Sequence, residues 1–536
     1  MNMDWGSYAY PSRRSVIFAK NGMAATGTPQ AAQAGIETMQ RGGNAIDAIV
    51  AMAMCLPVVE PTANGIGGDA FALAYVNGTL HGLNASGWAP SKINAALLRE
   101  KGFLDMPVRG FAPVTVPGAP SAWAALSGRF GRLSLSEAAE PAIRYAAEGF
   151  PVSASTAQGW RGAVENFAKT CTGDEYKPWF EVFAKGGKAP EAGEIWRDAD
   201  MAETLREIGR TNAESFYRGD LMEKIVKFSD AFGGYFIRED FCDFVPAWVT
   251  PLSVPYRGYE VCEIPPNGQG IAALMALNIL SRFELDGQRE TARNYHLQIE
   301  AMKLAFADAL QHVTDARDMR IPVKDLLSQE YAAERSRLVA DKAKVFTYGR
   351  PSGSGTVYLC AADGEGNMVS YIQSNYMGFG SGLCVPGTGI SLQNRGCNFS
   401  LDPGHVNELE PRKRPYHTII PGFLMKEGRP VGPFGVMGGF MQPQGHVQMV
   451  VNTVDFHMNP QEALDAPRWQ WSHKKNIALE GFMDAGIVRE LSELGHEVSL
   501  SPRYGPMGRG QIIWRMPNGT LCGGTEPRTD GAVALW

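Results

Sequence analysis

The sequence lacks any long run of uncharged apolar residues. A membrane-spanning helix needs about 20 such residues, and the longest candidate among the 536 residues, Ala45–Val59, carries Asp47 and is followed by Glu60. We read it as a buried helix. The first 22 residues also lack the apolar core of about 7–15 residues that marks a secretory signal. We therefore expect no membrane partner and a cytoplasmic location.

An excess of positive charge and a pattern of paired cysteines are also missing. The chain has 50 basic and 56 acidic residues and a net charge of −6, which disfavours nucleic acid as a partner. Its eight cysteines are scattered, with no C-x-x-C pair and no histidine close to any of them. This spacing predicts small buried thiols rather than a disulfide framework or a zinc site.

The familiar catalytic motifs are absent as well. The sequence contains no H-E-x-x-H, no G-x-S-x-G and no G-x-x-x-x-G-K-[ST], and no G-x-G-x-x-G leads a helix. These absences disfavour metalloprotease, serine hydrolase and nucleotide-binding functions, and we expect neither a metal nor a cofactor. A hydrophobic fraction of 44% excludes a disordered chain.

Glycine and proline are abundant, with 61 and 34 residues, and they punctuate clear elements. Apolar residues at helical spacing predict a helix over Pro29–Arg41, and Asn44 is placed to cap a second, wholly apolar helix. Further helices are expected at Leu135–Glu148, Ala199–Gly209, Gly219–Phe232, Gly270–Ser281, Ala292–Thr314 and Gln444–Val454.

Strands are expected mainly after residue 355. Thr356–Ala362 and Met368–Ser374 flank a five-residue Asp/Gly/Asn turn, which predicts a β-hairpin. Later strands are expected at Thr418–Met425, Ile477–Glu480, Glu497–Leu500 and Gly510–Met516. A helical half followed by a strand-rich half fits either two domains or one layered body.

The junction Pro351-Ser-Gly-Ser-Gly-Thr356 combines a run of small residues with a hydroxyl residue at the start of a strand. It fits an ordinary loop. It also fits a cleavage site, because cutting the Gly355–Thr356 peptide bond would give Thr356 a free α-amine beside its hydroxyl. An α-amine has a pKa of about 7.7–8.0 and can serve as a general base, and a threonine activated by its own amine performs acyl transfer.

A series of short motifs in fixed order closely resembles the gamma-glutamyltransferase family. The matches run from about residue 15 to the C-terminus and are Arg41-Gly-Gly-Asn-Ala-Ile-Asp47, Glu60-Pro61 with Gly65-Ile-Gly-Gly68, Val116-Pro-Gly118, Tyr256-Arg-Gly-Tyr259, Pro265-Pro266, Thr356-x-Tyr358, Phe379-Gly-Ser-Gly382, Gly387-x-Gly-Ile390, Lys413-Arg-Pro415, Gly438-Gly439, Ala466-Pro-Arg468 and Glu526-Pro-Arg528.

The resemblance implies an N-terminal nucleophile hydrolase, an α+β protein with a four-layer αββα sandwich. A precursor would cut itself into a large subunit, residues 1–355, and a small subunit, residues 356–536, which together form one body. Thr356 would be the nucleophile, Gly438 and Gly439 would form the oxyanion hole, and Asn375 would lie beside the nucleophile. The glycine pair also fits a plain turn, and Asn375 a strand end.

Two departures from the family pattern concern its clamp for a zwitterionic glutamyl group. Ser86 stands where the family has an arginine that holds the α-carboxylate. Asn398 stands where the family has the aspartate that holds the α-amino group. Losing both charges removes several kcal/mol of specific binding, since each charge-assisted hydrogen bond contributes about 1.5–3 kcal/mol.

Other substitutions fall at pocket positions of the family. The Ser-Ser pair becomes His417-Thr418, the threonine near the nucleophile becomes Gln373, and a glutamine becomes Arg395. We expect these residues to bind substrate, with Arg395 holding a carboxylate. A surface or ion-paired arginine fits the sequence equally well.

Three functions remain open at this stage. The first is a self-processed amidohydrolase acting on a small, oxamate-like amide without an α-amino group. The second is a gamma-glutamyl hydrolase or transferase acting on glutathione or related compounds, and the third is an inactive family member with a binding role. The expected partners are a small-molecule amide and the two subunits of the chain itself, and a homodimer is an open arrangement.

Overall fold

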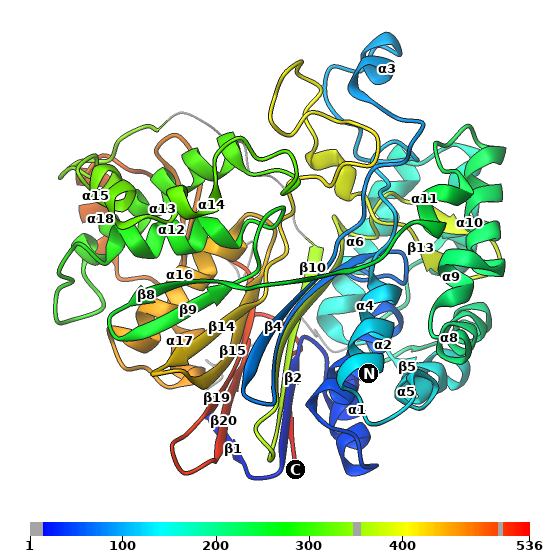
Figure 1. The fold of residues 1–536 in the computed structure, drawn as a ribbon, viewed down its shortest axis with the longest axis horizontal. Coiled ribbons are helices and arrows are strands. Elements are labelled where there is room, and N and C mark those ends of the chain that lie inside the picture. The colour runs from blue at the N-terminus through cyan, green and yellow to red at the C-terminus, as the bar shows by residue number, and fades with distance from the viewer. Residues whose placement is uncertain (1–13, 347–354, 502–506) are drawn as a thin grey trace.

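The computed structural model describes residues 14–346, 355–501 and 507–536, and is built around two seven-stranded sheets (Figure 1). We call them sheet A and sheet B. The strands of sheet A, in spatial order, are β1 (Ile17–Ala19), β20 (Leu521–Thr525), β19 (Arg509–Arg515), β15 (Arg429–Met437), β14 (Gly422–Lys426), β9 (Tyr259–Glu263) and β8 (Leu252–Tyr256). Those of sheet B are β21 (Ala532–Leu535), β2 (Gly22–Thr26), β10 (Gly355–Asp363), β11 (Met368–Tyr376), β3 (Asp69–Val76), β4 (Thr79–Ala85) and β7 (Ala247–Val249).

The two sheets face each other across a hydrophobic layer, and helices cover their outer faces (Figure 1). Side chains such as Phe71, Tyr358 and Phe423 fill the space between the sheets. The principal helices outside sheet B are α1 (Pro29–Gln40), α2 (Ala45–Val59), α4 (Ala119–Phe130) and α5 (Leu135–Glu148). Those outside sheet A are α12 (Gly270–Leu280), α13 (Ala292–His312), α16 (Met441–Val454) and α17 (Pro460–Asp465). This is the expected four-layer αββα sandwich.

The remaining helices and short strands lie outside the two large sheets and their principal helices. The helices are α3 (Ala95–Glu100), α6 (Ala154–Thr170), α7 (Lys177–Phe183), α8 (Ala199–Thr211), α9 (Glu214–Arg218), α10 (Asp220–Ala231), α11 (Arg238–Cys242), α14 (Val323–Leu326), α15 (Gln329–Ser336) and α18 (Ala485–Glu493). The short strands are β5 (Phe150–Pro151), β6 (Ile195–Trp196), β12 (Cys384–Val385), β13 (Ile390–Ser391), β16 (Trp469–His473), β17 (Asn476–Glu480) and β18 (Glu497–Ser501). Three 3₁₀ turns complete the described elements, at Asp174–Tyr176, Lys185–Gly187 and Arg395–Asn398.

Local sequence signals explain the central elements. The Asn44 side chain accepts hydrogen bonds from the first turn of α2, and the Asp47 carboxylate accepts one from the backbone N–H of Asn44, forming a capping box. Every residue of α2 is buried, as its apolar composition predicts. The predicted hairpin is β10 and β11, paired antiparallel from Ala362–Met368 back to Gly355–Tyr376.

Each sheet contains strands from both sides of residue 355. In sheet B, β10 lies between β2 and β11, and β11 pairs with β3. In sheet A, β14 pairs with β9, and β1 pairs with β20. The helix-rich part of the chain before residue 355 and the strand-rich part after it are therefore not two separate domains. Each sheet is complete only when both parts of the chain contribute to it.

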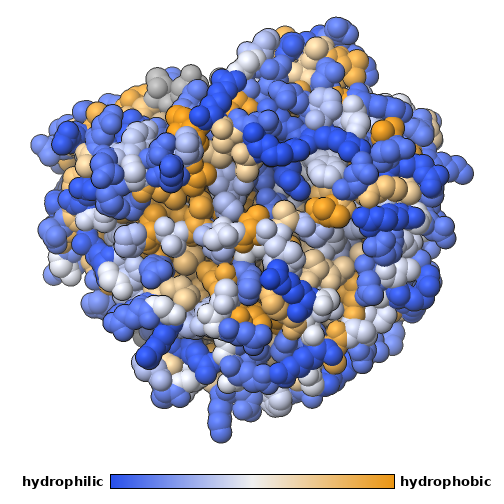
Figure 2. All heavy atoms as spheres, viewed as in Figure 1, coloured by the Kyte–Doolittle hydropathy of each residue, from blue (hydrophilic) through white to orange (hydrophobic). Residues whose placement is uncertain are grey.

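Hydrophilic side chains cover most of the face seen in Figure 2, and hydrophobic ones gather toward its middle. Within the described ranges, no helix combines the length and the apolar character that crossing a membrane requires.

Candidate active site

Thr356 is the second residue of β10 and is completely buried. Its Oγ1 donates a hydrogen bond to Oγ of Ser374 on the neighbouring strand β11, at 3.0 Å. The pairing of the two strands contains an irregularity here: Gly355 lies opposite Tyr376 and Val357 opposite Gln373, so β11 has one extra residue. Thr356 and Ser374 continue the register of Val357 and Gln373, so their side chains share one face of the sheet, and the β-bulge falls between this pair and Tyr376.

Gln373 points away from Thr356, to the other face of sheet B. Gln373 lies opposite Val357, on the face of sheet B that packs against the helices. Its Oε1 accepts hydrogen bonds from Trp123 Nε1 at 2.8 Å and from the Tyr371 hydroxyl at 3.1 Å, and its Nε2 donates to the carbonyl of Ala53. The expectation that Gln373 binds substrate has no support in this geometry, because side chains alternate between the two faces of a strand.

The Gly438–Gly439 turn directly follows β15, which crosses β10. At Gly435 of β15, a Cβ atom would come within 2.4 Å of the Tyr358 ring, so the two strands approach closely. Met437 and Thr356 line the same small cavity, of about 10 Å³. Both turn glycines have positive φ, 140° and 59°. Among the described residues, the N–H groups of Gly438 and Gly439 donate no hydrogen bond, as a site awaiting an oxyanion requires.

Gln269 fixes the back of this turn. Its Nε2 donates to the carbonyl oxygen of Gly439 at 2.8 Å and to that of Thr418 at 2.6 Å. The turn, and the segment that carries His417 and Thr418, are thereby held by one amide group. The sequence analysis missed Gln269, whose only signal is a glutamine between two glycines at the start of a helix.

Asn375 lies on β11 against the Gly65–Gly68 loop. Its Nδ2 donates to Ser391 Oγ at 2.8 Å, and its Oδ1 has no donor among the described residues. A Cβ atom on Gly65 would lie 2.3 Å from the Asn375 amide, so this loop passes too close for any other residue. The structure thus explains the glycine motif by close packing against Asn375.

Arg395 is a buried cation with free donors. Its guanidinium lies 4.1 Å from the centre of the Tyr376 ring, and its Nη1 donates to Thr418 Oγ1 at 2.5 Å. Its Nε and Nη2 have no acceptor among the described residues. Burial lowers the pKa of Arg395 to about 10, so the group still carries its charge at neutral pH. Of the two interpretations that fit the sequence, the surface arginine is wrong.

Asp69 and His417 form a second buried pair, and Asp69 was missed by the sequence analysis. His417 Nε2 lies 3.0 Å from Asp69 Oδ2, and Asp69 Oδ1 accepts hydrogen bonds from Gln393 and from the backbone N–H groups of Gly87 and Gly118. Burial lowers the pKa of His417 well below its usual value, and the charge of Arg395 adds to this effect. His417 is therefore neutral, and because its Nδ1 accepts the backbone N–H of Ile419 at 3.4 Å, its Nε2 carries the hydrogen and donates it to Asp69.

Ser86 and Asn398 both have structural hydrogen bonds. The Ser86 hydroxyl donates to Asn84 Oδ1 at 2.7 Å, and its carbonyl accepts from Arg414 Nε at 2.9 Å. Asn398 Nδ2 donates to the carbonyl of Tyr416 at 3.0 Å. Neither residue supplies a charge, and both hold together the loops around Arg395.

A buried ion network stands behind the glycine turn and contains two of the family motifs. Arg528 binds both carboxylate oxygens of Glu480 and also Glu526, and Arg468 binds Glu526 at 2.8 Å. Arg468 further donates to the carbonyls of Met507 and Gly508, and Gly508 lies against Gly438. The network thereby anchors the segment that packs on the proposed oxyanion turn.

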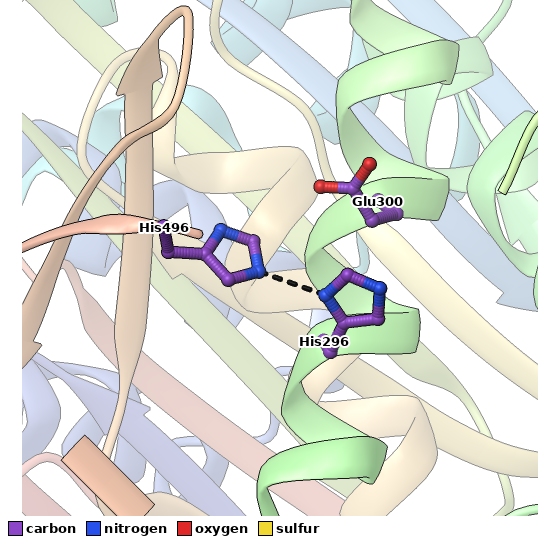
Figure 3. Close-up of side chains that lie close together, drawn as sticks. All are labelled: His296, Glu300 and His496. Carbon is purple, nitrogen blue, oxygen red and sulfur yellow. Dashed lines mark hydrogen bonds between the residues drawn. The ribbon is translucent and has the colours of Figure 1, made fainter. Parts of the chain in front are cut away.

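One cluster has the composition of a metal site, namely His296, Glu300 and His496 (Figure 3). His296 Nε2 lies 2.7 Å from the Ala340 carbonyl, which can only accept, so His296 Nδ1 accepts from His496 Nε2 at 2.9 Å. The Glu300 carboxylate binds the buried ammonium of Lys303 at 2.6 Å. A metal ion would have to displace this ammonium, and the residues fit a hydrogen-bonded polar cluster better.

An αββα sandwich in which a buried threonine opens an inner strand defines the class of N-terminal nucleophile hydrolases. Residues 31–536 match the family model for gamma-glutamyltranspeptidase. The glutathione hydrolase-like YwrD proenzyme of Bacillus subtilis is 38% identical over 514 residues, covering 94% of this chain and 96% of that protein. The oxamate amidohydrolase proenzyme of Klebsiella pneumoniae is 34% identical over 532 residues, covering 96% and 98%.

A solved structure is more similar still. The crystal structure of cephalosporin acylase from Bacillus halodurans superimposes with a TM-score of 0.97 at 55% identity, covering 100% of this chain and 99% of that one. The chain belongs to the gamma-glutamyltranspeptidase family and is an enzyme of that family. The resemblance stated from its motifs is confirmed.

Proposed function

We propose that the chain cuts itself before Thr356 and hydrolyses an amide whose acyl group carries a carboxylate and no α-amino group. Oxamate is the simplest such compound. The observation that carries the proposal is the buried Arg395, with two nitrogens that lack an acceptor among the described residues. Buried donors of a cation that make no hydrogen bond are costly, and a substrate carboxylate would offset that cost.

The arrangement supplies the parts that acyl transfer needs. Thr356 Oγ1 attacks the amide carbonyl carbon, and the α-amine of the same residue takes the hydroxyl proton. The N–H groups of Gly438 and Gly439 stabilise the oxyanion, and the amine returns its proton to the leaving nitrogen. Water then attacks the acyl-enzyme by the same route, which releases the acid and restores Thr356.

Among the described residues, the groups next to Arg395 offer no free carboxylate for an ammonium group, which argues against a glutamyl substrate. Asp69 is the buried carboxylate that interacts electrostatically with Arg395, and its two oxygens already accept hydrogen bonds from His417, Gln393 and two backbone N–H groups. Asn398, at the position of the family aspartate, is neutral. Hydrolysis of glutathione or of related gamma-glutamyl compounds is thus the second candidate, favoured by the similarity to the glutathione hydrolase-like protein.

A comparison of substrates tests the proposal. The purified, processed protein is assayed with oxamate, with its neutral analogue oxamide, and with a gamma-glutamyl anilide, by measuring released ammonia or aniline. We expect kcat/KM for oxamate to exceed that for oxamide by about tenfold or more, since one charge-assisted hydrogen bond contributes about 1.5–3 kcal/mol. A kcat/KM for the anilide above that for oxamate would establish the second candidate instead.

A further inference from the structure

Glu60 is a buried carboxyl group close to Thr356 that the chemistry above does not use. It follows the last residue of α2 and is 3% exposed. Glu60, Thr356 and Gln511 line the same cavity of about 10 Å³. Glu60 Oε2 and Gln511 Oε1 are both buried and have no hydrogen-bond donor among the described residues. These two oxygens lie beside Thr356 and could both be satisfied by one group that donates several hydrogen bonds.

The main-chain nitrogen of Thr356 faces this side of the strand. The Thr26 hydroxyl donates to the carbonyl oxygen of Tyr358, so the peptide groups of Tyr358 face β2. Backbone groups alternate between the two edges of a strand, and β10 is regular here because the extra residue lies in β11. The nitrogen of Thr356, two residues earlier, therefore faces the same edge as the peptide groups of Tyr358.

Strand β2 ends at Thr26, and Glu60 occupies the edge beyond it. A Cβ atom on Gly27 would lie 2.9 Å from Glu60 Oε2 and 3.4 Å from Val357 Cγ1, so Gly27 leaves room for the carboxyl group beside the strand. The Arg509 guanidinium approaches Glu60 Oε1 only to 3.6 Å. Arg509 lowers the pKa of Glu60 and the charge of Asp530 raises it, but burial dominates and brings it to about 7.

We infer that Glu60 is a positioning residue, whose carboxylate binds the α-amino group released when the chain is cut before Thr356. The inference rests on the proposed function, since hydrolysis of the Gly355–Thr356 bond consumes one water and yields the Gly355 carboxylate and the Thr356 amine. The ammonium form would donate to Glu60 Oε2 and Gln511 Oε1. In turnover, the neutral amine takes the Thr356 hydroxyl proton and becomes that ammonium, so Glu60 stabilises the charge that forms as Oγ1 attacks.

The direct test is a titration of the Thr356 α-amine, which does not depend on the substrate. Cyanate carbamylates neutral amines, and the rate at Thr356 is followed against pH by peptide mass spectrometry. An opposite charge within about 4–6 Å shifts a pKa by about 1–3 units. We expect Glu60→Gln to lower the pKa of the amine by at least one unit, and the acidic limb of kcat/KM for oxamate to move by the same amount. Glu60→Asp retains the charge and should restore most of the shift.

Two further variants test whether a shift in the pKa of the amine is specific to Glu60. Glu365→Gln removes an exposed carboxylate at the far end of the same hairpin, paired with Arg132, and should leave the pKa of the amine unchanged. Arg509→Gln removes the cation that competes for Glu60 and should raise the pKa of the amine, which decides the question if Glu60→Gln is not cut. Equal amine pKa values in the wild type and in Glu60→Gln would overturn the role of Glu60, as would an amine pKa that does not rise in Arg509→Gln. Either result would leave the proposed function standing. A wild-type chain that stays uncut would overturn the proposed function, and with it this inference.

Discussion

The hydroxyl of Thr356 donates a hydrogen bond to the hydroxyl oxygen of Ser374 across 3.0 Å, between neighbouring strands of one sheet. Ser374 also accepts the backbone N–H of Tyr376 at 2.6 Å, which fixes its rotamer. The two residues lie opposite each other in the regular register of the hairpin, just before the extra residue of β11. The proposed nucleophile is thus oriented by a residue from its own hairpin.

Processing is the first prediction. Purified wild-type protein, weighed by mass spectrometry under denaturing conditions, should give two fragments, the smaller beginning at Thr356, in place of the 58.2 kDa chain. Thr356→Ala should remain a single chain without activity, because it has no hydroxyl for the attack on Gly355. Thr356→Ser, which retains the hydroxyl, is the matched control and should be cut. An active wild-type preparation of intact chains would refute this prediction.

The second prediction separates two adjacent residues of β11. Ser374→Ala removes the acceptor of the Thr356 hydroxyl, and we expect processing and kcat each to slow by about tenfold, the equivalent of about 1.4 kcal/mol. Gln373→Ala should instead lower the free energy of unfolding by about 1–3 kcal/mol, because the buried Trp123 indole loses its acceptor. Chemical denaturation and single-turnover cleavage distinguish the two effects. Equal effects of both changes on cleavage would contradict the geometry.

Arg395 provides the third prediction. Arg395→Gln should raise KM for oxamate by about tenfold or more, since a charge-assisted hydrogen bond contributes about 1.5–3 kcal/mol. Its KM for the neutral amide oxamide should change by less than threefold. Arg395→Lys keeps the charge but loses the two-pronged geometry and should give an intermediate KM. An unchanged kcat/KM for oxamate in Arg395→Gln would refute carboxylate binding.

The fourth prediction concerns pH and stability, and is best measured in the uncut Thr356→Ala protein. Burial raises the pKa of Glu60 from 4.5 to about 7. Below pH 4.5 the carboxyl is protonated in both the folded and the unfolded state and has no effect. As the pH rises from 4.5 to 7, the unfolded state loses its proton first, so the carboxyl increasingly destabilises the folded protein.

Glu60→Gln removes this titration. The free energy of unfolding of Glu60→Gln, measured relative to that of the parent, should therefore increase by up to about 3 kcal/mol between pH 4.5 and 8, so that the variant becomes relatively more stable. Urea denaturation at the two pH values measures the difference, with Glu365→Gln as the exposed control. A difference that does not depend on pH would show that Glu60 keeps its ordinary pKa.

The ion network behind the glycine turn gives the fifth prediction. Glu480→Gln should lower the free energy of unfolding by about 3–5 kcal/mol, because it leaves two buried arginines, Arg468 and Arg528, to share the single carboxylate of Glu526. Replacing Glu140, an exposed partner of Arg41, by Gln should cost less than about 1 kcal/mol. Similar losses in both variants would show that the network does not stabilise the fold.

Local patterns in the sequence predict much of the fold. The capped apolar helix α2, the amphipathic helix α5 and the hairpin of β10 and β11 are present where the pattern places them, because capping and periodicity act within a few residues. The strand expected at Thr418–Met425 is shorter, since β14 spans only Gly422–Lys426. Its first residues instead bind Gln269 and Arg395.

The sequence by itself determined the family and the fold class, and it predicts roles for Thr356, Arg395 and the Gly438–Gly439 turn. Only the tertiary structure decided which groups surround them. Asp69, Gln269 and Glu60 reach the site from distant parts of the chain. The pairing register of β10 and β11 decides that Ser374, and not Gln373, faces Thr356, since successive side chains of a strand point to opposite faces of the sheet.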